Sequence, residues 1–434
     1  MGTPATTYAT TADGLSIAYQ ELGSGPPVVL VCGTGSHVEL FWELPGWAHV
    51  LRSLARRHHV VFFDKRGAGL SDRTLGSASL EDRMEDIRAV LDGAGLDSAT
   101  LIGISESGPI CAMFTASNPE RVERLVLLAS FAHYPRMASA AKLFERAWGD
   151  GTLLEAIWAR GVRDRELVGR IERAVGTPKS MGALMRANGT IDVRPVLPLV
   201  TVPTLVVHCA HDPVIDVSNG RELASLVPDA QLVEVDGDFH GSGRPDEMQL
   251  YLDALAGFLA DDLPRGVASA DRVLATVLFS DIVGSMERAA ELGDARWAEL
   301  LDDHDRITER AVADQRGRVV KTTGDGVLAT FDGPATAIAA AHRMIEHLRV
   351  VGLDIRVGIH TGEIERRGDD IGGLGVNLAA RVLHAAADGE VWVSSTVPGL
   401  TVGAPVEFEP RGRHALKGIP GEWDLYAARL DGSS

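Results

Sequence analysis

The chain has 434 residues, of which 45% are hydrophobic and 24% are charged, a length that predicts two or three domains with packed cores. Its formal net charge of −18 argues against the basic surface that nucleic acid or anionic lipid requires. No apolar run is long enough to span a membrane, and the N-terminus lacks the layout of a signal peptide. We therefore expect a soluble, cytoplasmic protein with neither a nucleic-acid nor a membrane partner.

The first part of the chain alternates short apolar runs with helical patterns, which predicts a parallel sheet covered on both faces. Between about residues 132 and 198 this rhythm is replaced by helical segments alone. We expect this stretch to form a helical cap over the carboxyl edge of the sheet. The predicted strands cover residues 26–32, 58–63, 99–104, 124–129, 203–209 and 231–235.

The composition changes after residue 260, and we predict a domain at 1–260, a linker at 261–272 and a second domain at 273–434. The second domain begins with a strand and a long helix. Two further helices alternate with the strands that follow. Helices grouped on one face of a mostly antiparallel sheet would make it an α+β domain. The strands predicted after the first helix cover residues 318–323, 327–331, 354–360 and 390–394.

A serine stands in a turn between a predicted strand and a helix, in G-I-S-E-S-G at residues 103–108. A sharp turn of small residues exposes the hydroxyl of such a serine above the sheet. Asp212 and His240 each follow a later strand, which gives the chain order serine, aspartate, histidine. An early strand ends in C-G-T-G at residues 32–35, where backbone N–H groups could face a developing oxyanion. By itself the serine motif also fits an ordinary glycine-rich turn.

These motifs, with D-K-R-G-A-G-L-S-D at residues 64–72, resemble the α/β-hydrolase superfamily over roughly residues 8–260. The resemblance implies hydrolysis of an ester or thioester, and a small apolar or ester ligand. Two positions differ from the family pattern, because Ser107 replaces the second glycine and Cys32 replaces the usual histidine. The alternative is a sensor domain with a vestigial site. The implied groups are Ser105 as nucleophile, His240 as general base, Asp212 as its orienting group, and the N–H groups of Thr34 and Glu106 as oxyanion hole.

Two aspartates in the second half follow predicted strands, in V-L-F-S-D-I-V-G-S at 277–285 and in K-T-T-G-D-G at 321–326. Adjacent strands would bring Asp281 and Asp325 together as oxygen ligands for Mg²⁺ or Mn²⁺, with nucleotide phosphates completing the shell. Taken singly, each aspartate would more often be a cap or a turn residue. Asn377 and Arg381 lie four residues apart on one predicted helical face. Lys417 stands beside a glycine in a later turn.

Together these segments resemble the class III nucleotidyl cyclases over roughly residues 273–430, and the resemblance implies a ferredoxin-like domain that acts as a homodimer. Lys321 and Asp370 match the pair that reads the base. An ammonium and a carboxylate complement the N1 and amino group of adenine and not the edge of guanine, so the pair implies ATP. In G-I-H-T-G-E at 358–363, we interpret His360 as structural. The other implied roles are metal binding by Asp281, Asp325 and the carbonyl of Ile282, ribose positioning by Asn377, and phosphate contacts by Arg381 and Lys417.

The sequence therefore predicts an adenylate cyclase that uses two Mg²⁺ or Mn²⁺ ions at a homodimer interface to make cyclic AMP and pyrophosphate. The N-terminal domain would be a sensor or a second enzyme. One alternative is a serine esterase whose cyclase domain is a regulatory nucleotide-binding module. Another is a non-enzymatic dimerisation scaffold controlled by a ligand.

Overall fold

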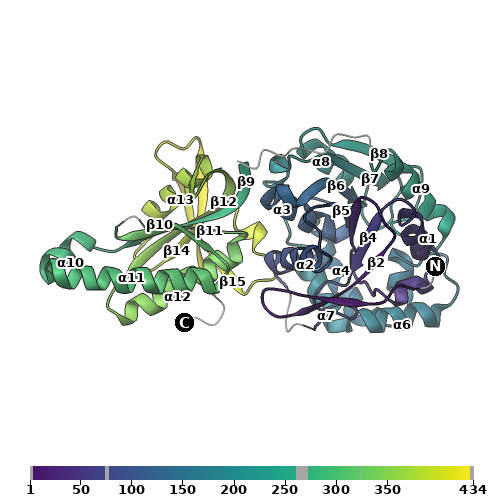
Figure 1. Ribbon diagram of the computed structural model, residues 1–434, viewed down its shortest axis with the longest axis horizontal. Coiled ribbons are helices and arrows are strands. Elements are labelled where there is room, and N and C mark those ends of the chain that lie inside the picture. Colours follow the sequence, from purple (N-terminus) through teal and green to yellow (C-terminus); the bar gives the residue numbers. More distant parts are fainter. Residues whose placement is uncertain (1–2, 74–77, 261–271, 323, 431–434) are drawn as a thin grey trace. The chain divides into compact units, whose positions relative to one another are not determined.

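The computed structural model describes residues 3–73, 78–260, 272–322 and 324–430. The chain divides into two compact units, residues 1–269 and 270–434 (Figure 1). The expected linker at 261–272 lies outside the described residues except for Arg272, which begins a strand. Each unit is described by itself below.

The N-terminal unit contains a sheet with the strand order β1-β2-β4-β3-β5-β6-β7-β8. The strands from β4 to β8 in this order run parallel, while β1 and β2 add an antiparallel edge that the sequence analysis missed. The central strands are almost wholly apolar because helices cover both of their faces. The strands are β1 Thr7–Thr10, β2 Ser16–Leu22, β3 Pro27–Val31, β4 His59–Phe63, β5 Ala99–Ile104, β6 Val122–Leu128, β7 Thr204–Cys209 and β8 Gln231–Val235.

Helices cover both faces of this sheet, with α1 and α9 packed together on one side and α2 and α3 on the other (Figure 1). Local signals fix where they begin. Ser79 and Asp82 form a capping box at the start of α2, and proline occupies the first position of α1 and α9. The helices are α1 Pro45–Leu54, α2 Leu80–Gly93, α3 Gly108–Ser117, α8 Ser218–Leu226 and α9 Pro245–Ala256.

Four helices stand between β6 and β7, where the sequence predicted a cap at about 132–198. Their buried side chains, among them Phe144, Ile171 and Met185, join one continuous apolar core with the strands and with α1 and α9. The cap is therefore packed onto the unit as part of its core. Its helices are α4 Arg136–Ala147, α5 Thr152–Ile157, α6 Arg165–Val175 and α7 Pro178–Asn188.

The C-terminal unit contains a mostly antiparallel sheet with the order β10-β11-β9-β12-β14-β16-β15, and β13 pairs with the end of β12. β9 lies between β11 and β12, antiparallel to both. The sequence analysis missed β13, β15 and β16. The strands are β9 Arg272–Ile282, β10 Arg318–Thr322, β11 Gly326–Phe331, β12 Ile355–Arg367, β13 Asp370–Gly372, β14 Val391–Ser394, β15 Val406–Ala415 and β16 Glu422–Leu430.

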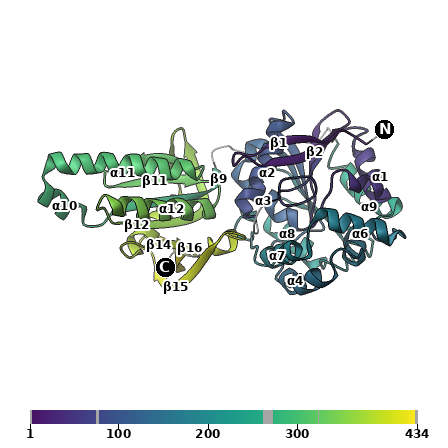
Figure 2. The ribbon, with the colours of Figure 1, turned by 90° about the horizontal axis from the view of Figure 1, so that it is seen from below.

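The helices of this unit cover both faces of its sheet, so the expectation that they gather on one face is wrong. Leu278 of β9 packs with α11 and α12, whereas the next side chain back, Val277, packs with Ala379 of α13. Successive side chains of a strand point to opposite faces. α11 and α12 run side by side (Figure 2). The helices are α10 Ser285–Leu292, α11 Asp294–Asp314, α12 Pro334–Val350 and α13 Leu374–Ala385.

α13 lies directly on β12, and one glycine allows this approach. A Cβ on Gly358 would come 2.1 Å from the backbone nitrogen of Leu383. Among the described helices, none is both long enough and apolar enough to cross a membrane.

Candidate active sites

Ser105 stands at the tight turn between β5 and α3 with a φ of 55°, in the left-handed region that a non-glycine residue rarely adopts. Its carbonyl accepts a hydrogen bond from Ser130 Oγ at 2.7 Å, which holds this conformation. A Cβ on Gly108 would lie 1.9 Å from the same Ser130 Oγ, so the glycine after the turn is required by packing. The strained backbone conformation of Ser105 places its hydroxyl within hydrogen-bond distance of His240.

The structure brings Ser105, His240 and Asp212 into one hydrogen-bonded chain. His240 Nε2 lies 2.9 Å from Ser105 Oγ, and His240 Nδ1 lies 2.7 Å from Asp212 Oδ2. The side chains of His240 and Asp212 are fully buried. Asp212 Oδ1 accepts from two backbone N–H groups of the turn that follows β7. The arrangement can remove a proton from the serine hydroxyl while the aspartate holds the imidazole in position.

A second histidine, His208, lies beside the aspartate and was not singled out in the sequence. Its Nε2 lies 3.6 Å from Asp212 Oδ2 and 2.8 Å from the carbonyl of Ile215. Burial lowers the pKa of His208, which favours a neutral ring. His240, at 2.7 Å from Asp212 Oδ2, is the closer of the two histidine partners of this aspartate.

The backbone expected to form the oxyanion hole lies against the nucleophile. A Cβ on Gly33 would come 2.8 Å from Ser105 Cβ and equally close to the ring of Trp158, so only glycine permits this approach. The Trp158 indole N–H donates to the carbonyl of Thr34 at 2.9 Å, which fixes the loop. Thr34 and Glu106 thus flank the serine from the β3 loop and from the turn itself.

The serine that replaces the second glycine of the motif is accommodated. Ser107 is fully buried, and its Oγ donates to the carbonyl of Cys32 at 2.6 Å and accepts from Lys65 Nζ at 2.9 Å. Lys65 also forms an ion pair with the buried carboxylate of Glu106. Ser107 therefore joins a polar network behind the turn, to which Cys32 contributes its backbone carbonyl while its side chain packs in the apolar core.

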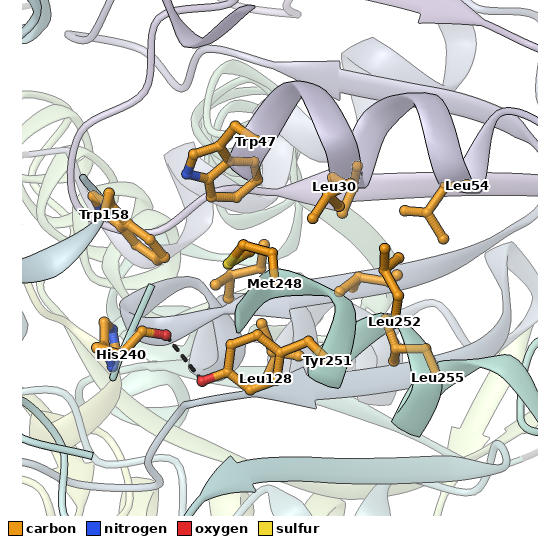
Figure 3. Close-up of a pocket in the computed structure, with 13 residues that line it drawn as sticks. Leu30, Trp47, Leu54, Leu128, Trp158, His240, Met248, Tyr251, Leu252 and Leu255 are labelled. Carbon is orange, nitrogen blue, oxygen red and sulfur yellow. Dashed lines mark hydrogen bonds between the residues drawn. The ribbon is translucent and has the colours of Figure 1, made fainter. Parts of the chain in front are cut away.

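An apolar cavity lies beside the imidazole of His240 (Figure 3). Its wall includes Trp47 of α1, Trp158 of the cap and Tyr251 of α9, and the Tyr251 hydroxyl donates to the carbonyl of His240 at 2.9 Å. The rings of Trp158 and His240 lie 5.3 Å apart. The Trp158 ring and the Tyr251 hydroxyl thus add two contacts that hold the histidine in position.

In the C-terminal unit, Asp281 and Asp325 lie at neighbouring strand ends. Asp281 is paired in register with Gly326 of β11, and the N–H of Ile282 donates to the carbonyl of Asp325 at 2.9 Å. Asp325 Oδ2 accepts from Ser285 Oγ, at the start of α10, at 2.5 Å. Strand pairing therefore brings the two carboxylates to one end of the sheet, beside the start of a helix.

An arginine that the sequence analysis missed lies at the same place. Arg356 of β12 is paired in register with Asp281, and its Nη2 donates to Asp281 Oδ2 at 2.9 Å. No spacing rule predicts this contact, because it depends on the antiparallel register of two strands that are 75 residues apart. The site contains a cation as well as two carboxylates.

Lys321 and Asp370 meet within one chain. Lys321 Nζ, on β10, lies 2.8 Å from both carboxylate oxygens of Asp370 at the start of β13. This ion pair lowers the pKa of the Asp370 carboxyl. Asn377 and Arg381 both lie on α13, and Lys417 is exposed in the turn between β15 and β16. Within the described residues, no hydrogen bond or ion pair joins these last three to Asp281 or Asp325.

A family model described as alpha/beta hydrolase fold matches residues 26–242, which is half of the chain. The chain belongs to the alpha/beta hydrolase fold family. A second model, described as adenylate and guanylate cyclase catalytic domain, matches residues 268–428. The protein thus combines a hydrolase domain with a class III cyclase domain, as the sequence predicted.

Relatives are found for each domain. The "Putative carbamate hydrolase RutD" of Azorhizobium caulinodans is 26% identical over 263 residues, which cover 56% of this chain and 94% of that protein. The "Putative adenylate cyclase 3" of Rhizobium meliloti is 36% identical over 166 residues, which cover 34% of this chain and only 27% of that protein. A solved hydrolase from Pseudomonas aeruginosa has 24% identity and a TM-score of 0.51, covers 59% of this chain and 98% of its own, and shows the fold alone.

His360 of the cyclase domain is a buried structural residue. Its Nδ1 lies 2.7 Å from Ser394 Oγ on the neighbouring strand β14, and its ring meets the edge of Trp423. Burial lowers the pKa of His360 to about 4. The ring is therefore neutral at physiological pH.

This burial predicts a loss of stability in acid. A histidine with a folded pKa of about 4 and an unfolded pKa of about 6.5 stabilises the fold fully above pH 6.5, and this contribution is lost as the pH falls toward 4. Between about pH 7 and pH 5 the cyclase domain should lose about 2 kcal/mol of unfolding free energy from this residue. His360→Asn should remove that part of the pH dependence in urea unfolding. An equal loss in both proteins would contradict the assignment.

Proposed function

We propose that the cyclase domain converts ATP to cyclic AMP and pyrophosphate. The observation that carries this proposal is the ion pair between Lys321 and Asp370, with the ammonium 2.8 Å from both carboxylate oxygens. The pair presents a donor and an acceptor side by side, which complements the N1 acceptor and amino donor of adenine. Guanine presents the reverse pattern, a donor at N1 and an acceptor at O6, so in the same orientation it would set donor against donor and acceptor against acceptor.

The oxygen atoms of Asp281 and Asp325 fit a hard divalent cation such as Mg²⁺ or Mn²⁺, with the carbonyl of Ile282 as a further ligand. The described part of the chain holds no group of three or more metal-binding side chains. Two carboxylates agree with a site that nucleotide phosphates complete. A bound ion, or a pair of them, would supply Lewis-acid stabilisation of charge on the phosphates.

The remaining groups would bind and orient the nucleotide. Arg381 would stabilise charge on the α-phosphoryl oxygens, and Asn377, four residues before it on α13, would position the ribose. Lys417 would neutralise the terminal phosphates. Arg356 already contacts Asp281, so it would exchange this carboxylate for a phosphate oxygen when the nucleotide enters.

We further propose that each cyclase site is shared between two chains. Among the described residues, no hydrogen bond or ion pair joins Asn377, Arg381 or Lys417 to Asp281 or Asp325 of the same chain, so a partner would supply these three groups. Two identical chains packed about a two-fold axis would build two equivalent sites.

Base choice tests the first proposal. Unmodified protein should use ATP in preference to GTP, and Lys321→Glu combined with Asp370→Cys should lower the ratio of the two kcat/KM values by at least about tenfold. The single variant Lys321→Glu, which leaves two carboxylates side by side, should weaken the use of both nucleotides. Equal use of ATP and GTP by the unmodified protein would show that the pair does not read the base.

Complementation tests the shared site. Asp281→Ala and Arg381→Ala proteins should each be inactive, because every site of either homodimer lacks one required group. After random subunit exchange, half of the dimers contain one intact site of two, so activity should return to roughly a quarter of the unmodified level. The control mixture of Asp281→Ala with Asp325→Ala should stay inactive, since each site then lacks one aspartate. An inactive first mixture despite proven exchange would contradict the shared site.

A second function is favoured by the hydrogen-bonded chain from Ser105 through His240 to Asp212. We propose that the N-terminal domain is a serine hydrolase of the ester or thioester class. Its relative from Azorhizobium caulinodans, named as a hydrolase of carbamates, extends the candidate substrates to related acyl compounds. His240 would take the proton of Ser105 as the serine attacks the carbonyl, and the N–H groups of Thr34 and Glu106 would face the oxyanion.

A fluorophosphonate probe should label Ser105 of the intact chain, since His240 activates its hydroxyl. His240→Ala should reduce the labelling rate by about two orders of magnitude or more, while His208→Ala should leave most of it. Peptide mass spectrometry identifies the labelled residue. Absence of labelling with probes of several sizes would favour a sensor domain.

A further inference from the structure

Trp158 follows α5 of the cap, yet its side chain lies among the groups proposed for catalysis in the hydrolase domain (Figure 3). The residue is buried, with an exposure of only 1%. Its ring lies 5.3 Å from the ring of His240 and 5.6 Å from that of Trp47. A side chain of the cap therefore packs directly against the proposed general base.

The same indole holds the loop that carries the Thr34 N–H. The indole N–H donates to the carbonyl of Thr34 at 2.9 Å. On the other side of Thr34, the carbonyl of Gly33 accepts from Lys65 Nζ at 3.3 Å. The Gly33 carbonyl and the Thr34 N–H belong to one planar trans peptide group, in which they point in opposite directions. Holding the carbonyl on each side of the Thr34 Cα therefore holds the direction of its N–H.

Two glycines allow the indole ring to pack against the loop and against the histidine segment. A Cβ on Gly33 would come 2.8 Å from Cζ2 of the Trp158 ring. A Cβ on Gly241, directly after His240, would come 2.3 Å from Cε3 of the same ring. The Gly241 N–H also donates to the carbonyl of Ile157 at 2.8 Å. The histidine segment is thus joined to the cap by a backbone hydrogen bond as well as by the ring.

The backbone that carries Trp158 is itself held by a buried carboxylate. Glu172 of α6 has an exposure of 0%. Its carboxylate accepts from the backbone N–H groups of Gly149 at 2.6 Å, Gly151 at 2.9 Å and Leu154 at 2.7 Å. The carbonyl of Leu154 in turn accepts from the N–H of Trp158 at 2.7 Å. Hydrogen bonds to an ionised acceptor are strong, so α5 and Trp158 are tied firmly to α6.

We propose that Trp158 is a positioning residue of the hydrolase reaction, which holds the Thr34 N–H and the His240 ring in the geometry that Ser105 requires. This role rests on the hydrolase function proposed above. The other oxyanion donor, the Glu106 N–H, belongs to the turn that carries the nucleophile, whereas the Thr34 N–H lies in a loop and depends on outside contacts. Loss of the indole N–H should therefore slow the chemical step without weakening the binding that precedes it.

Fluorophosphonate labelling at several probe concentrations separates the limiting rate constant of labelling, kinact, from the concentration for half-saturation, KI. In this step the Ser105 oxygen bonds to phosphorus, fluoride leaves, and the hydroxyl proton passes to His240. Trp158→Phe in the full chain keeps an aromatic ring and removes the donor. The value of kinact should fall at least about tenfold, less than the roughly 100- to 1,000-fold loss that follows removal of a whole oxyanion donor. KI should stay within about threefold, because the indole N–H acts on the chemical step.

Trp42→Phe is the matched control. The Trp42 indole N–H donates to Gln20 Oε1, a side chain of β2, at 2.7 Å. This variant therefore also loses one indole hydrogen bond of the same domain, but one that involves neither the oxyanion loop nor the histidine. It should leave kinact unchanged. An equal fall of kinact in both variants would show a general effect on the fold and overturn the proposal, as would an unchanged kinact in Trp158→Phe.

The benzothiophene analogue of tryptophan, incorporated at position 158 of the full chain, replaces Trp158→Phe if that protein does not fold. The analogue keeps the shape of the indole and has sulfur in place of the N–H, so the packing against His240 remains. The value of kinact should again fall at least about tenfold, and an unchanged value would overturn the proposal. The two proposals for this domain are distinguished by the unmodified protein. Its failure to be labelled would refute the hydrolase function and the positioning role together, whereas rapid labelling that the changes at position 158 do not slow would refute the positioning role alone.

Discussion

Covering both faces of a sheet confines the chemistry of each domain to the ends of its strands. Inside the strands, alternate side chains enter one apolar layer or the other, and a charged group there would lose its hydration without gaining a partner. Ser105, Asp212 and His240 therefore all follow strands of the hydrolase domain. Asp281 and Asp325 lie at the ends of paired strands in the cyclase domain. The same packing that builds the cores also leaves these ends as the places where polar groups converge.

At the nucleophile turn, buried charge has to be balanced locally. Glu106 is fully buried directly after Ser105, and it is paired with Lys65 from the β4 loop and with Arg83 from α2. Removing either cation from such a network would leave a buried carboxylate short of a partner, which costs far more than an exposed ion pair contributes. The turn is thus held by three segments that lie far apart in the sequence.

In the cyclase domain, several of the groups proposed to bind the nucleotide or its metal ion are already paired within the chain. Arg356 contacts Asp281, Ser285 contacts Asp325, and Lys321 contacts Asp370. These contacts hold each side chain near the place where it would act and satisfy it without ligand. A nucleotide must exchange them for its own phosphates and base. The free energy of binding is reduced accordingly, while the geometry is prepared in advance.

The sequence by itself determined the two families, most of the strands and the identities of the candidate groups, because these depend on local patterns. A strand followed by small residues and a serine, or by an aspartate and a glycine, encodes its own turn. The tertiary structure alone decided which groups meet. The contact of Arg356 with Asp281 follows from strand register, and the placement of α13 on the opposite face follows from packing against Val277. The contact of Trp158 with Thr34 follows from the cap meeting the β3 loop across more than a hundred residues. Such contacts depend on free energies summed over the whole fold, and no short segment of sequence encodes them.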